Sequence, residues 1–162
     1  MSLLSLLFIQ AAALAFALVG GVFLAFSDFI MRSLTRVSPE GGAEAMQVIN
    51  REVFRWVFMA LFLGLAPVSV GLVLLGASLP APWTGPLLAA AGITYLLGCF
   101  GVTIARNVPL NERLARMDAR EAATQAFWRE TYAPRWTRWN TRRGLACVVA
   151  AALCLAAVSS GI

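Results

Sequence analysis

The sequence predicts an all-α fold, an integral membrane four-helix bundle, from three observations. Hydrophobic residues make up 60% of the 162 residues and charged residues only 13%, whereas soluble domains carry roughly a quarter charged residues. The mean hydropathy is +0.77. Four apolar segments are about as long as the roughly 20 residues that cross a bilayer as a helix. We therefore expect a single membrane domain over residues 1–162.

Proline positions help to set the limits of these helices. Pro134 suits the first turn of a helix, so the fourth span should begin there. Pro109 should end the third helix near Asn107, because the residue before a proline avoids the helical region. The expected spans cover about residues 3–34, 50–76, 86–106 and 134–159.

Two further helices are expected outside the spans. Ser38 followed by Pro39 is typical of a helix start, so a short helix should lead into the second span. Residues 110–132 read as an amphipathic cytoplasmic helix between spans 3 and 4, because Leu110 and Leu114 recur at a helical interval. We expect this helix to lie against the surface of the bundle.

The charged residues predict the orientation. All 13 basic residues are arginines, against 8 acids and no histidine, which gives a net charge of +5. Every arginine lies in or beside the loop between spans one and two or the loop between spans three and four. The positive-inside rule then predicts that these loops are cytoplasmic and that both termini lie outside. The composition, rich in Ala, Arg, Gly and Leu without Lys, suggests a bacterial inner membrane protein.

Composition also excludes several kinds of chemistry. Without histidine, the chain cannot ligate haem, zinc or copper through imidazole, and it cannot form a Ser-His-Asp or Cys-His catalytic site. The three cysteines, Cys99, Cys147 and Cys154, lie in apolar runs without CxxC spacing. We therefore expect no structural metal site.

Polar residues at the cytoplasmic ends of the spans are the first candidates for a site. Asp28 ends the first apolar run, and an acid near lipid depth is either functional or an interfacial partner of Arg32. Arg106, Asn107 and Asn111 flank the expected end of span three. They are either helix caps or the lining of a small polar pocket.

A second set of candidates precedes span four. Trp136, Trp139 and Arg142 share one helical face, because each follows the last by three residues. They could form an interfacial anchor belt or line a cavity for a planar anionic substrate. The alternation of Trp and Arg fits contact with membrane lipid better than with nucleic acid, so no nucleic-acid partner is expected.

Four sequence blocks occur in a recognisable order: GVFLAFSDFIMRSL, AMQVINREVF, VTIARNVPLNERLAR and FWRETYAPRWTRWNTRRG. In these blocks the chain resembles the family of small four-span membrane proteins that includes the fungal anthrone oxygenases. The resemblance covers about residues 20–144, and its most specific part is NVPLN followed by tryptophan, asparagine and arginine. The matching positions are Asn50, Asn107, Pro109, Asn111, Trp128, Trp139, Asn140 and Arg142.

The resemblance implies a membrane-embedded, cofactor-independent oxidase or oxygenase. Its partners would be O₂ and a hydrophobic phenolic or anthrone-type aromatic molecule, whose activated methylene becomes a carbonyl without a metal or flavin. Such a reaction needs a base and donors to the resulting oxyanion. The predicted catalytic residues are Asp28 as the base with Arg142, Asn107 and Asn111, and the predicted substrate-binding residues are Asn50, Arg106, Trp128, Trp139 and Asn140.

A non-enzymatic function is the alternative, either a small membrane transporter or a ligand-binding or assembly subunit. The sequence shows no paired repeats and no charged residue in the middle of spans two to four, which disfavours a transporter. Glycines of spans two and three suit close helix contacts, within one chain or in a homo-oligomer. Oxygen consumption with an anthrone separates the enzyme from these alternatives.

Overall fold

The apolar segments form four long helices, each long and apolar enough to cross a membrane. The computed structural model describes residues 2–55 and 57–160, and over these ranges every regular element is helical. The long helices comprise α1 (Leu3–Ala25), η1 (Phe26–Ile30) and α2 (Met31–Leu34); α4 (Val57–Ser78); α5 (Thr84–Tyr95), η2 (Leu96–Gly101), η3 (Thr103–Asn107) and α6 (Val108–Ala115); and α7 (Ala122–Phe127), η4 (Trp128–Tyr132) and α8 (Ala133–Ser160). The predicted all-α membrane bundle is confirmed.

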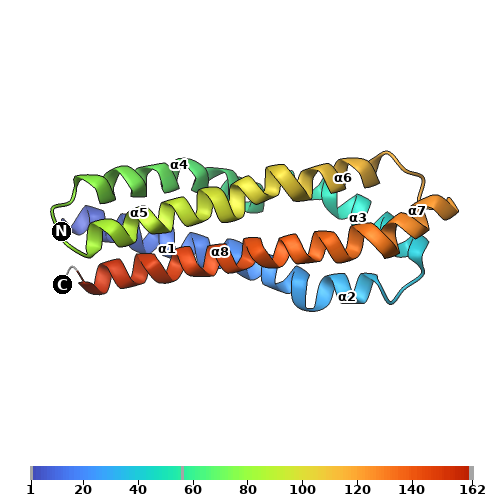
Figure 1. Cartoon of the computed structure of the whole chain (residues 1–162), viewed down its shortest axis with the longest axis horizontal. Helices are drawn as coiled ribbons and strands as arrows, with labels where there is room; N and C mark the ends of the chain where they lie inside the picture. Colours follow the sequence, from blue (N-terminus) through green and yellow to red (C-terminus); the bar gives the residue numbers. More distant parts are fainter. Residues whose placement is uncertain (1, 56, 161–162) are drawn as a thin grey trace.

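Consecutive long helices run antiparallel, so the start of α1 and the end of α8 lie at the same end of the bundle (Figure 1). Helix α1 packs against α8, and α5 packs against both α4 and α8. The opposite end carries the loops that hold the arginines, and we call it the arginine end. The short helix α3 (Pro39–Glu52) lies there, beside α6 and α7.

Helix α3 begins as predicted. Ser38 precedes it, and its hydroxyl accepts a hydrogen bond from the backbone N–H of Gly41, while Pro39 occupies the first turn. The second span is shorter than predicted at its start, because α3 continues to Glu52 and α4 begins at Val57 rather than near residue 50. Asn50, Arg51 and Glu52, which the prediction placed in this span, belong to α3 instead.

Two apolar clusters fill the bundle. The first lies between the apolar halves of the spans, where the hydroxyl of Tyr95 donates to the carbonyl of Phe62 over 2.7 Å. The second lies at the arginine end, and its largest fully buried side chains are Trp128, Tyr132 and Met46. Many leucines on the outer faces of the long helices are exposed. This distribution fits helices that are surrounded by lipid.

Pro109 does not end the third helix, contrary to the prediction. The residue before it, Val108, keeps helical angles (φ −58°, ψ −48°), and its N–H bonds back to Thr103 in the wider π turn η3. A proline ring clashes with the carbonyl four residues earlier in a regular α-helix, and a π turn relieves that clash by shifting the hydrogen-bond register. Pro134 likewise follows the π turn η4, inside one helix that runs from Ala122 to Ser160.

The structure differs from the predicted single helix over residues 110–132. The helix is interrupted at residues 116–121, so α6 forms the end of the third long helix and α7 forms the start of the fourth. One local contact and one long-range contact stabilise this break in the helix. The carboxylate of Asp118 accepts from the N–H of Arg120, and the Gln47 amide donates to the carbonyls of Leu114 and Met117. Both contacts satisfy backbone groups that a continuous helix would use.

Candidate functional site

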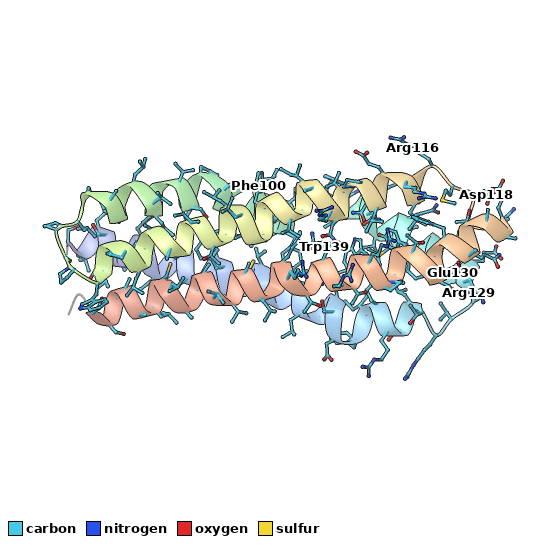
Figure 2. All side chains as sticks on the ribbon, viewed as in Figure 1. Phe100, Arg116, Asp118, Arg129, Glu130 and Trp139 are labelled. Atoms are coloured by element: carbon cyan, nitrogen blue, oxygen red, sulfur yellow. The ribbon has the colours of Figure 1, made fainter. Side chains whose placement is uncertain are left out.

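A cavity of about 320 Å³ lies where the apolar part of the bundle meets the arginine end. Residues from all four long helices and from the short helix α3 line this cavity. They belong to α1, η1, α3, α4, η2, η3, α6 and α8. Phe100, which lines the cavity, is labelled about half-way along the bundle in Figure 2, and the labelled charged residues lie farther toward the loops of the arginine end. The cavity lining combines apolar side chains with Asn50, Asn111, Asn140 and Arg143, and we call the part lined by these four residues its polar end.

Aromatic rings form the apolar walls. Phe58 and Phe62 are stacked with their planes 10° apart, Phe23 meets Phe58 edge to face, and Phe100 lies 5.6 Å from Phe62 between ring centres. All four residues line the cavity. Such walls favour a planar aromatic ligand, which can stack on some rings and meet others at their edges.

Arg143 supplies the charge at the polar end. Arg143 is only 6% exposed. One terminal nitrogen donates to the hydroxyl of Thr103 over 3.2 Å, and the other donates to the side-chain carbonyl of Asn140 over 2.7 Å. The guanidinium carbon lies 4.3 Å from the centre of the Phe23 ring. Nε has no hydrogen-bond partner among the described residues.

No acidic side chain neutralises Arg143 in the part of the chain that the structure describes. The ion pairs found there join Arg55 to Glu52, Arg116 to Glu112 and Arg120 to Glu40, all at the surface. Burying a charge without a counter-charge costs several kcal/mol. A cavity that keeps such a charge is suited to an anionic ligand.

Asn140 holds this guanidinium in position. Its NH₂ group donates to the backbone carbonyl of Phe23 over 2.6 Å and to the hydroxyl of Ser27 over 2.7 Å. These bonds orient the amide so that its oxygen faces Arg143. The contact joins α8 to the first helix at its π turn, where Phe26 also enters the cavity.

Asn111 organises a second polar group at the same end. Its side-chain oxygen accepts two hydrogen bonds of 2.8 Å, one from the hydroxyl of Tyr132 and one from the indole N–H of Trp136. The Tyr132 oxygen in turn accepts from the amide of Asn50 over 3.2 Å. Both asparagines line the cavity. Because the oxygen of Asn111 is occupied, only its NH₂ group remains to bond to a ligand, and it can act only as a donor.

The structure brings together some of the residues that the sequence singled out. Asn50, Asn111 and Asn140 line the cavity. Asn107 is buried nearby and donates to the backbone carbonyl of Trp136 over 3.3 Å, a contact between two helices rather than with the cavity. Trp128 is buried in the cluster at the arginine end, stacked on the Tyr132 ring at 5.4 Å.

Other predicted residues lie outside the cavity. Asp28 is exposed on the π turn η1 and is not among the residues that line the cavity. Arg106 and Arg142 are exposed and lie over the ring of Trp139, on the outer surface. Successive helical residues are about 100° apart, so Arg142 and Arg143 cannot face the same way. The cation at the cavity is thus Arg143 rather than Arg142.

The sequence did contain a signal for Arg143. Trp136, Asn140, Arg143 and Cys147 are spaced by four, three and four residues, which is the spacing of one helical face. All four are buried. The spacing of Trp139 and Arg142 drew attention to the neighbouring face, which turns outward. Among the described residues, no three of His, Cys, Asp and Glu come together as a metal site would require.

Fold and cavity define a protein with four membrane-spanning helices and a cavity that combines aromatic walls with a buried arginine. The sequence profile of the anthrone oxygenase family matches residues 51–153, so the chain belongs to this family. The match includes Asn111, Asn140 and Arg143 of the cavity. Family membership indicates an oxygenase-like function in a membrane protein. No curated protein and no solved structure matches the chain.

Proposed function

We propose that this chain is a membrane-embedded oxygenase that uses O₂, without a resident cofactor, to oxidise a hydrophobic phenolic or anthrone-type molecule. The observation that carries the proposal is the buried guanidinium of Arg143, without an acidic partner among the described residues, at the polar end of an aromatic cavity. Family membership supports the same reaction class.

The chemistry begins with an anion. An anthrone that loses a methylene proton gives an aromatic anthrolate, whose charge resides largely on oxygen. Arg143 would pair with that oxygen, and the donors of Asn50 and Asn111 would add hydrogen bonds. Preorganised donors to a developing oxyanion are worth about 10²–10³-fold each in rate. The phenylalanine walls would hold the rings and exclude water.

Oxygen then reacts with this electron-rich anion. The anion gives one electron to O₂, and the resulting radical pair joins to form a carbon–oxygen bond, which leaves a hydroperoxide after protonation. Loss of water across the C–H and O–O bonds gives the carbonyl. Overall, the methylene and O₂ yield a carbonyl and water, so no external reductant is needed. O₂ and planar aromatics both partition into lipid, which favours their meeting in a membrane cavity.

In this proposal no carboxylate of the protein accepts the methylene proton of the substrate. No acidic residue is among those that line the cavity. Pairing the substrate oxygen with Arg143 makes the methylene more acidic, and water or hydroxide can then accept the proton. Asp28, the base predicted from sequence, is exposed and outside the cavity. Our proposal therefore does not use it.

Oxygen uptake with the purified full chain tests this function. In uncharged detergent with anthrone, the wild type should consume O₂ and form anthraquinone well above the rate of spontaneous oxidation. Arg143→Gln should lower the enzymatic rate by about 10²–10³-fold. Arg135→Gln, which removes an exposed arginine of the same helix, is the matched control and should keep the rate.

Two results would contradict the oxygenase. Wild-type protein that leaves the spontaneous rate unchanged with several anthrones and hydroquinones would exclude this reaction. Saturable binding of the same molecules without O₂ uptake would favour the alternative, a ligand-binding membrane subunit.

The proposed membrane is the bacterial inner membrane with the arginine end in the cytoplasm, as the positive-inside rule predicts.

A further inference from the structure

Three arginines surround one tryptophan on the outside of the bundle. The guanidinium carbons of Arg142, Arg106 and Arg138 lie 4.4, 5.0 and 5.9 Å from the centre of the Trp139 ring. Arg106 belongs to η3 and the others to α8, so two helices build the cluster. We call these four residues the arginine cage. Figure 2 labels Trp139 part-way along α8, before its apolar half.

The cage is a concentration of unpaired positive charge. None of the ion pairs within 4.0 Å in residues 2–55 and 57–160 involves Arg106, Arg138 or Arg142. Because all three guanidinium carbons lie within 5.9 Å of one ring centre, their positive charges are held near one another and repel, with screening at physiological salt acting over about 8 Å. A shared anion would remove this repulsion, and guanidinium groups match phosphate oxygens in geometry.

An apolar stripe continues from the cage along the outside of α8. Arg138, Arg142, Leu145 and Val149 follow at intervals of four, three and four residues and so share one face. Leu145 is 61% exposed and Val149 47% exposed. On the neighbouring helix, Ile104 is also exposed two residues before Arg106. Cations at the end of a membrane-facing apolar stripe match the shape of a phospholipid.

We propose that the arginine cage binds the phosphate group of an anionic phospholipid, whose acyl chains lie along Leu145 and Val149. This site is separate from the cavity that contains Arg143, and it goes beyond the proposed oxidation. The indole of Trp139 holds the guanidinium groups together through cation–π contacts, and the headgroup supplies the missing negative charge.

Lipid titration tests the site. Dioctanoyl phosphatidylglycerol is added to the full chain in uncharged maltoside detergent, and the unfolding temperature and the bound lipid, by native mass spectrometry, are followed. We expect saturable binding that raises the unfolding temperature. The triple variant Arg106→Gln, Arg138→Gln, Arg142→Gln should bind about 100-fold more weakly, since each arginine near an anionic headgroup contributes about fivefold, the equivalent of about 1 kcal/mol.

A second triple variant separates this cage from general charge attraction. Arg36→Gln, Arg51→Gln, Arg116→Gln removes the same net charge from exposed positions elsewhere at the arginine end and should keep the affinity. Equal weakening in both triples would overturn the proposal. If the cage triple does not fold, as judged by its unfolding temperature without lipid, Arg142→Gln alone gives the test, with about fivefold weaker binding expected.

Two further ligands define the source of the phosphate. Dioctanoyl phosphatidylcholine, whose headgroup carries no net charge, should give no stabilisation at the same concentrations. Inorganic phosphate at millimolar concentration should not reproduce the stabilisation either. If inorganic phosphate stabilises the chain as well as the lipid does, and through the same arginines, the site binds free phosphate and the lipid assignment is overturned.

Discussion

Arg143 and Asn140 lie one turn apart on α8 and share a hydrogen bond of 2.7 Å, from a guanidinium nitrogen to the amide oxygen. Asn140 is itself bonded to Phe23 and Ser27 on the first helix, and Arg143 is bonded to Thr103 on the third. Three long helices therefore fix the position of one buried charge. A donor held in this way needs little reorganisation when an anion forms beside it.

Replacing Asn140 by alanine should destabilise the bundle. The change removes the partner of Arg143 and leaves the carbonyl of Phe23 without its side-chain donor. Buried polar groups that lose their partner cost about 1–3 kcal/mol each, so the unfolding temperature in detergent should fall clearly. Ser159→Ala, which removes an exposed hydrogen bond to Leu155, is the control and should change it little. Similar unfolding temperatures for both variants would refute the anchoring role of Asn140.

Arg143→Met should separate stability from activity. The methionine keeps much of the apolar volume and removes a buried charge that lacks an acidic partner among the described residues. Removing this charge is favourable, whereas the side-chain oxygen of Asn140 loses its donor, so the two effects offset each other and the unfolding temperature should change little while anthrone oxidation is lost. A marked drop in unfolding temperature would show instead that the bonds to Thr103 and Asn140 hold the fold together.

The stability of the bundle should depend on the acceptor oxygen of Asn111. Asn111→Leu leaves the Tyr132 hydroxyl and the Trp136 indole N–H without their acceptor, at about 1–3 kcal/mol for each buried donor. Asn111→Asp keeps an acceptor at that position and should restore much of the stability. Thermal unfolding compares the two variants. If both lose stability equally, the hydrogen bonds to this oxygen are not the cause.

Asp28→Asn should leave both turnover and folding nearly unchanged. The side chain is exposed on η1 and does not line the cavity. Rates of anthraquinone formation, measured for wild type and variant in the same detergent, check this. A hundredfold loss would instead identify Asp28 as the general base that the sequence predicted, since that is the size of effect a base contributes.

Close packing between the second and third spans should depend on Gly92. A side-chain carbon added there would overlap the backbone carbonyl of Ser69 on α4, and backbone cannot move aside cheaply. A side-chain carbon added at Gly64 would meet no other atom within 4 Å. Gly92→Ala should therefore lower the unfolding temperature, whereas Gly64→Ala should leave it unchanged or raise it slightly by favouring the helix. Equal effects would mean that the two helices separate easily.

The sequence predicted the fold well because long apolar runs in a membrane have few alternatives to the helix. It also predicted Asn111 as a site residue from its place near the end of an apolar helix, and Asn50 and Asn140 through the family resemblance. These three line the cavity, and their roles in catalysis and substrate binding remain predictions.

The helix ends were harder to predict, for a physical reason. Pro109 and Pro134 normally indicate the start or end of a helix, yet each follows a π turn that accommodates its ring. A π turn has no simple sequence signature, and each one also rotates the residues that follow it. The break at 116–121 depends on Gln47, which lies about 70 residues earlier in the chain. Local patterns cannot reveal such a contact.

The choice between Arg142 and Arg143 shows the same limit. The two residues are adjacent and chemically identical, so only the rotation of α8 decides which one meets the cavity. Trp139 and Arg142 form a pair at helical spacing, but their face is outward and joins the arginine cage. The buried face contains Trp136, Asn140 and Arg143. The buried face has a single arginine, whereas the outward face has Arg138 and Arg142 beside Trp139, so the outward face was the more conspicuous one in the sequence.

Anaerobic binding of anthrone tests whether Arg143 stabilises the substrate anion, because without O₂ only this step can occur. Anthrone and its anion absorb at different wavelengths, so mixing the full chain with anthrone under nitrogen at neutral pH reports ionisation in the cavity. We expect the wild type to give the anion spectrum with saturable binding, and Arg143→Met to bind anthrone without forming the anion. An identical spectrum for both proteins would contradict the claim that the buried guanidinium stabilises the substrate anion.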